Sequence, residues 1–183
     1  MKTKLFTLAA ALGFTMGVVA QNSVSVDAGA AWLGYANIFD PATGDFVFGE
    51  PWGVPDIKTV VDAGAGTLTL QPNFNTYAAN PTDPFWVDQT TGLGAKIFEG
   101  NSYIEDNSLA GAELTFSGNV NSNTLDGAYD AVAFIKVFNA NYSVLKQATV
   151  PLNGATFEVV FTDVNPAEDA VVQYGFQIIG LNA

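Results

Sequence analysis

The chain has 183 residues, of which 18 are acidic and six are lysine, so its net charge at pH 7 is −12. It contains no cysteine and no histidine, which excludes disulfides, thiolate chemistry, Cys and His metal sites and a histidine general base. Nucleic acids and anionic lipid surfaces are poor partners for such a chain, because phosphate binding depends on lysine and arginine.

The first twenty residues have the pattern of an export signal. Lys2 and Lys4 form a positive start, Leu5 to Val19 is apolar, and small residues precede a cleavage position after Ala20. The apolar run is shorter than the roughly 20 residues that span a bilayer, so we expect a secreted protein, extracellular or periplasmic, without membrane insertion. The mature chain, residues 21–183, keeps four lysines and all 18 acids, which gives a net charge of −14.

Residues 21–183 are predicted to be β-structure almost throughout. Four segments alternate between apolar and polar residues: GTLTLQP (66–72), AELTFSGNV (112–120), ATFEVVF (155–161) and VVQYGFQII (171–179). A fifth, DAVAFIKVFN (130–139), is apolar on both faces, as in a strand that is covered on each side. Turn signals such as DPATGD (40–45), NPTDP (80–84) and VNPAED (164–169) separate about ten such candidate strands.

This pattern predicts an all-β fold. Short strands separated by turns, without a sustained helical period, favour a two-sheet antiparallel β-sandwich that is jelly-roll-like. No linker, repeat or change of composition divides residues 21–183, which have the size of one domain. We therefore expect a signal peptide over residues 1–20 and a single β-sandwich domain over residues 21–183.

A series of motifs carries a family resemblance over nearly the whole mature chain. The motifs, in order, are WLGYANIF (32–39), FVFGEPWGV (46–54), FW (85–86), YIE (103–105), LAGAELTFSG (109–118), SNTL (122–125), AFIKVF (133–138) and VQYGF (172–176). The chain resembles a family of secreted bacterial domains, mostly of unassigned function, whose members often carry C-terminal sorting signals. The segment LAGAELTFSG is also similar to the start of a strand in carbohydrate-binding jelly rolls.

The resemblance implies an exported, jelly-roll-like β-sandwich that acts as a binding or accessory domain, and it supplies no known ligand. The chain departs from the family pattern after the last expected strand, where it reaches Ala183 without a sorting helix or a basic tail. The expectation is therefore either a released protein or a fragment.

Candidate ligand-binding residues lie in two aromatic segments. In VFGEPWGVPD (47–56), Trp52 is flanked by Glu50 and Asp56, and in DPFWVDQ (83–89), Trp86 lies between acids. Flat aromatic faces beside carboxylates suit a sugar ring, because a ligand pocket is mostly apolar with a few placed polar groups. Aromatic residues also fill sandwich cores, and the sequence favours the interpretation that the first segment seals one end of the sandwich, with Trp52 only partly exposed.

Lys136 is the fourth candidate. It shares a face of its predicted strand with Phe134, and a buried charge without a partner is costly. A lysine that reaches the polar rim and a lysine in a functional cleft both fit the pattern, and Glu105 is a possible partner.

Among metals, a chain whose ligands are carboxylate and carbonyl oxygens alone points to calcium, so calcium is a possible cofactor. Candidate loops contain Asn80 and Asp83, Asp126 and Asp130, or Asp163, Asn165, Glu168 and Asp169, and none has the EF-hand spacing. Each such loop alone is more often an ordinary turn than a metal site, so metal ligands stay unknown.

The sequence therefore predicts a secreted, non-catalytic binding module, of the carbohydrate-binding kind, rather than an enzyme. Its expected partner is a polysaccharide or an extracellular matrix. The alternative is a structural or adhesive protein that self-associates or joins a matrix through exposed strand edges.

Overall fold

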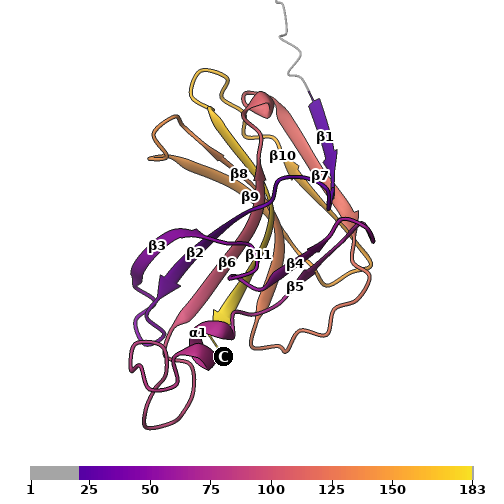
Figure 1. Ribbon diagram of the computed structural model, residues 1–183. Coiled ribbons are helices and arrows are strands. Elements are labelled where there is room, and N and C mark those ends of the chain that lie inside the picture. The colour runs from indigo at the N-terminus through magenta and orange to yellow at the C-terminus, as the bar shows by residue number, and fades with distance from the viewer. Residues whose placement is uncertain (1–20, 183) are drawn as a thin grey trace, which may run out of the picture.

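The computed structural model describes residues 21–182 of the protein (Figure 1). The predicted signal segment, residues 1–20, lies outside the described residues. The strands are β1 (Gln21–Ser25), β2 (Leu33–Phe39), β3 (Phe46–Trp52), β4 (Thr59–Asp62), β5 (Thr67–Leu70), β6 (Ile97–Glu105), β7 (Glu113–Asn119), β8 (Asp130–Phe138), β9 (Leu145–Pro151), β10 (Thr156–Phe161) and β11 (Val171–Leu181). The predicted all-β sandwich fold is confirmed.

Six strands form the large sheet, in the order β3-β2-β6-β11-β8-β9, and every neighbouring pair is antiparallel. The long strand β11 lies inside it, between β6 and β8. Its register places Gly175 opposite both Tyr103 on β6 and Phe134 on β8. This register decides which side chains share a face of the sheet.

The second layer is made of two smaller pieces. One is a three-stranded small sheet, in the order β1-β7-β10, in which β1 and β7 run parallel. The other is the antiparallel hairpin β4–β5. Figure 1 shows the small sheet and the hairpin in succession along the large sheet.

The main core lies between the small sheet and the β8–β11 half of the large sheet. Phe116 of β7 is completely buried and its ring lies 5.5 Å from that of Phe176 on β11. Inward residues of the predicted alternating strands, such as Phe157, Val159 and Tyr174, belong to the same core. The hairpin is fixed by a 2.6 Å hydrogen bond between the Thr59 and Ser102 hydroxyls, and Leu68 and Leu70 pack against this core.

Two short helices interrupt the strands: α1 (Asn75–Ala79) and the 3-10 helix η1 (Asn107–Leu109). Both are too short to produce the sustained period by which a helix is identified in a sequence. Among the described residues, no helix is both long and apolar enough to cross a membrane.

Candidate functional site

An aromatic cluster fills the other half of the sandwich, around Ile38 of β2 and Phe98 of β6. Its partly buried members are Phe48, Trp52, Phe85 and Trp86. The Trp52 ring lies 5.3 Å from the Phe98 ring and 6.4 Å from the Trp86 ring, both edge-on. The Trp52 indole N–H donates a 2.8 Å hydrogen bond to Glu50 Oε1. The cluster closes this end of the core and leaves part of both indoles exposed.

A groove of about 490 Å³ opens beside these two indoles, and we call it the Trp52 groove. Its lining residues are Pro51, Trp52, Gly53, Asp56, Asn75, Thr76, Ala79, Asn80 and Trp86. Three of the four residues that the sequence analysis named, Trp52, Asp56 and Trp86, therefore meet in one place. They come from the end of β3, the turn that follows it, and the segment between α1 and β6.

Asn75, at the start of α1, lines the groove and carries a buried acceptor without a partner. Its Oδ1 atom is buried, yet it accepts no hydrogen bond from any described residue. A buried carbonyl oxygen that is left unpaired costs free energy, and such atoms are rare in folded proteins. A ligand donor or an ordered water would satisfy it.

Two buried asparagines hold the walls of the groove together. Asn73 donates to the Asp56 carbonyl at 2.9 Å and accepts from the Thr76 hydroxyl at 2.8 Å, so it joins the turn after β3 to helix α1. Asn182 donates to Thr76 Oγ1 at 3.1 Å and to the Trp86 carbonyl at 3.0 Å. The groove is thus built on groups with fixed positions.

The chemistry of the groove is that of an acceptor-rich, aromatic surface. The Asp56 carboxylate is exposed and lies over Gly53, where a Cβ atom would come within 2.6 Å of Asp56 Oδ2. Among the described residues that line the groove there is no lysine. The arrangement suits a neutral ligand that has hydroxyl donors and one apolar face.

The other acids of the DPFWVDQ segment have a local role. Asp83 accepts a 2.8 Å hydrogen bond from the Phe85 N–H, and Asp88 accepts from the N–H groups of Thr90 and Thr91. The backbone N–H of Thr90, followed by that of Thr91, lowers the pKa of Asp88 below its ordinary value. These carboxylates stabilise turns and do not line the groove.

Lys136 lies elsewhere, because the strand register puts it on the opposite face of the large sheet from Trp52. Its ammonium donates to Asn101 Oδ1 at 2.9 Å, lies 4.4 Å from the Phe134 ring centroid and is 4.0 Å from Glu99 Oε1. Burial lowers the pKa of Lys136, and the charge of Glu99 opposes this shift. Lys136 therefore does not join the other three candidates.

The prediction that Glu105 is a possible partner of Lys136 was wrong. Glu105 Oε2 accepts hydrogen bonds from Gln173 at 2.9 Å and from Tyr142 at 3.3 Å. Glu99 instead joins Lys136 in a network in which Glu99 also accepts from Asn37 and Asn101. Lys136 on β8 contacts Asn101 and Glu99 on β6, across the intervening strand β11. These contacts depend on the register between the strands, which the sequence does not reveal.

Sequence reasoning missed the contribution of α1 to the groove. The signal that could have found it is the dense asparagine content of residues 73–80, where three asparagines accompany two aromatic residues. Asn80 was considered only for calcium, whereas its side chain donates to the Thr76 carbonyl at 2.8 Å. Asparagine favours turns and short helix starts, and here Asn75 and Asn80 line the groove.

The calcium prediction has no geometric support so far. Within residues 21–182 no group of three or more acidic side chains is arranged to hold a metal ion. Asp126 accepts from the Ala128 N–H, and Asp169 forms an ion pair with Lys146. Calcium stays a prediction.

Comparisons of the chain with protein-family models, with curated proteins and with solved structures gave no match.

Proposed function

We propose that this protein is a secreted, non-catalytic module that binds carbohydrate in the Trp52 groove. The observation that carries the proposal is the meeting of two partly exposed indoles with the exposed Asp56 carboxylate and with Asn75, whose buried Oδ1 has no partner. Export is proposed on the pattern of residues 1–20 alone.

The chemistry of a sugar matches both parts of this surface. The C–H face of a pyranose ring is apolar and packs against an aromatic ring, while its hydroxyl groups donate hydrogen bonds to carboxylate and amide oxygens. A rotation of the Asn75 side chain towards the bound sugar would give its Oδ1 the donor that it lacks in the free protein. Thr76 Oγ1 is already bonded to Asn73 and Asn182, so the groove holds no free hydroxyl that a base could activate.

The test is a titration of the purified protein with a panel of soluble neutral polysaccharides, with and without Ca²⁺. Tryptophan fluorescence reports binding, and the three indole N–H signals in a ¹H–¹⁵N spectrum identify the site. We expect a saturable change in the signals of Trp52 and Trp86 and none in that of Trp32. A folded protein that responds to no glycan would contradict the proposal.

The sharpest variant is Asn75→Ala. It removes the unpaired oxygen and places a better helix former at the start of α1, so the free energy of unfolding should not fall. Sugar binding should weaken about tenfold, the loss expected for one hydrogen bond to the bound sugar. Asn121→Ala, at an exposed position away from the groove, is the matched control and should leave binding unchanged.

A second candidate function is assembly through strand edges. β3 lies at one edge of the large sheet, and its Phe46 and Val47 side chains are 60% and 43% exposed. Edge strands with exposed apolar residues are templates for pairing with another chain. Sedimentation over a range of concentrations distinguishes the two: an assembling protein associates and Val47→Lys prevents this, whereas a binding module stays monomeric.

A further inference from the structure

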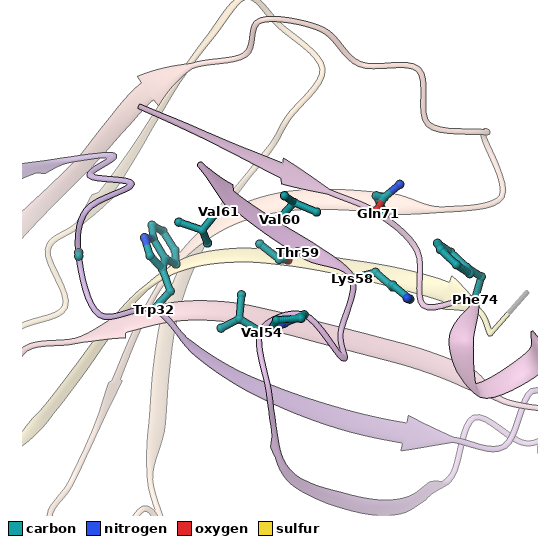
Figure 2. Close-up of a pocket in the computed structure, with 10 residues that line it drawn as sticks. Trp32, Val54, Lys58, Thr59, Val60, Val61, Gln71 and Phe74 are labelled. Carbon is teal, nitrogen blue, oxygen red and sulfur yellow. The ribbon is translucent and has the colours of Figure 1, made fainter. Parts of the chain in front are cut away.

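A second hollow lies beside the hairpin β4–β5, and we call it the Lys58 pocket (Figure 2). Its volume is about 500 Å³, and it is lined by Ala30, Trp32, Val54, Pro55, Lys58, Thr59, Val60, Val61, Gln71 and Phe74. Figure 2 shows Trp32 at one end and Lys58 with Phe74 towards the other, with valines between them. The turn over residues 53–58 contributes Gly53 and Asp56 to the Trp52 groove and Val54 and Lys58 to this pocket.

The walls of the pocket are mostly apolar and partly open to water. Val60 is 55% exposed and Phe74 is 42% exposed. The Thr59 hydroxyl is already bonded to Ser102. An apolar ligand would remove this surface from water, and that burial is favourable.

Lys58 is the only charged residue that lines the pocket, and among the four lysines of the described chain it is the one without an oxygen partner. Lys96 donates to a backbone carbonyl, Lys136 to Asn101 and Lys146 to the Asp163 carbonyl. The Lys58 ammonium instead lies 4.4 Å from the centroid of the Phe74 ring. In a chain with 18 acids, a lysine that meets no carboxylate has its donors available to a ligand.

The backbone at Lys58 adds an independent observation. Its φ angle is +66°, in the left-handed region where glycine or asparagine is favoured and a long side chain is strained. Strained residues gather at ligand-binding sites more than elsewhere. Here the strain places the one unpaired ammonium at the end of an apolar pocket.

We propose that the Lys58 pocket binds a small organic acid with an apolar body, such as a medium-chain carboxylate. The carboxylate accepts hydrogen bonds from the Lys58 ammonium, and the apolar body packs between Trp32 and the valines. A charge pair at the edge of an apolar pocket is screened less than one in open water, which strengthens it.

The charge of the chain limits the ligand further. With a net charge of −12, the protein repels polyanions at long range, and one lysine cannot offset several negative charges. The ligand is therefore a monoanion, and its affinity comes mostly from apolar burial.

Decanoate is the probe, with decan-1-ol as its uncharged counterpart. We expect saturable decanoate binding by calorimetry, with the Trp32 indole N–H signal shifting and those of Trp52 and Trp86 unmoved. Decan-1-ol should bind about tenfold more weakly, the factor expected from loss of one charge-assisted hydrogen bond.

Lys58→Gly separates binding from folding. Glycine adopts the positive φ without strain, so the variant should be at least as resistant to urea as the wild type and yet bind decanoate about tenfold more weakly. Lys58→Arg should retain binding. Val60→Glu places a carboxylate beside Lys58 and should abolish binding, whereas Val160→Glu, at a similarly exposed valine on β10, should not.

Three results would overturn the proposal. They are the absence of a saturable Trp32 response, equal affinity for decanoate and decan-1-ol, and an unchanged affinity in Lys58→Gly. Concentration-dependent dimerisation that Val60→Glu abolishes would show instead that the free edge of β4 contacts a second copy. Because the Trp32 signal reports this pocket alone, failure here leaves the carbohydrate proposal for the Trp52 groove untouched.

Discussion

At the scale of single residues, asparagine does most of the positioning near the Trp52 groove. The Asn182 side chain is completely buried and forms three hydrogen bonds: it donates to Thr76 and Trp86 and accepts from the Lys96 N–H at 2.9 Å. One side chain thus joins the end of β11 to the helix and to the loop, both of which line the groove. No apolar residue could replace it, because its partners would be left buried and unpaired.

We predict that Asn182→Ala lowers the free energy of unfolding by about 3 kcal/mol, since it leaves several buried polar groups without partners. Urea denaturation followed by circular dichroism measures the change. Asn121→Ala, at an exposed asparagine, should alter the free energy by less than about 0.5 kcal/mol. Equal stability of the two variants would show that the Asn182 contacts contribute nothing.

Lys58 illustrates a different effect at the same scale. Its left-handed backbone costs about 1 kcal/mol relative to glycine. The cost is recovered in Lys58→Gly, so that variant should unfold at a slightly higher urea concentration.

At the scale of elements, the pairing of β6 with β11 depends on a close approach at Gly175. A Cβ atom there would lie within 2.2 Å of the Ser102 carbonyl oxygen and 2.6 Å of the Tyr103 Cα, both backbone atoms of β6. Backbone atoms cannot move aside as the end of a side chain can. The strands reach this distance only because residue 175 has no side chain.

Gly175→Ala should therefore destabilise the protein by about 3 kcal/mol, because the two central strands of the large sheet must separate. The thermal midpoint measures the effect. Gly127→Ala is the control: a Cβ atom at Gly127 meets nothing within 4 Å, so its midpoint should stay near that of the wild type. A normal midpoint for Gly175→Ala would mean that the sheet relaxes there without cost.

At the level of single strands, the alternation of apolar and polar residues correctly predicted which side chains face the core. It did not predict which strands or loops lie next to one another. Period-two patterns correctly placed Phe157 and Val159 of β10 in the core, because burial on one face acts on each strand alone. The strand over residues 130–139 was expected to be covered on both faces, and Phe134 is indeed completely buried, but it is covered in part by Lys136 of the same strand.

Contacts between distant segments could not be predicted in the same way. Trp52 and Trp86 were chosen for their local surroundings, and their meeting depends on how the loop after α1 folds back over β2 and β6. Asn75 was not chosen at all, since an unpaired oxygen becomes visible only when its neighbours are known. Loops lack the periodicity by which strands are identified, so the contacts between two loops cannot be predicted from a single sequence.

At the scale of the whole molecule, the excess of acids is explained in part by turns. Aspartates at positions 27, 40, 62, 83, 88, 106 and 126 each accept a backbone N–H two or three residues further along the chain. An all-β chain has many turns, and aspartate is among the residues that stabilise them best. Much of the negative charge therefore serves the fold.

Four tyrosines determine how the free energy of unfolding changes at alkaline pH. Burial is the first cause that raises the pKa of Tyr103, Tyr129, Tyr142 and Tyr174 above the ordinary value of 10.0. Above pH 10.0 the unfolded chain releases these protons before the folded protein does, so the free energy of unfolding falls as the pH rises. The lowered pKa of Lys136 acts in the opposite direction below 10.5, but it is a single group.

We predict a progressive fall in the urea midpoint as the pH rises above about 10, with tyrosinate absorbance rising together with unfolding. Tyr174→Phe keeps the packing of a side chain that is only 8% exposed and removes one of the groups, so its decline should be shallower. An identical decline in Tyr174→Phe would show that Tyr174 does not contribute.

The contacts of Asn182 also determine when the Trp52 groove can exist. Its hydrogen bonds join residues separated by 106 and 96 positions in the chain, and they form only after β11 has entered the large sheet. Thr76 and Trp86 can therefore form these contacts only after β11 is in place. A nascent chain that already contains both indoles therefore still lacks the Trp52 groove, which is complete only when folding is complete.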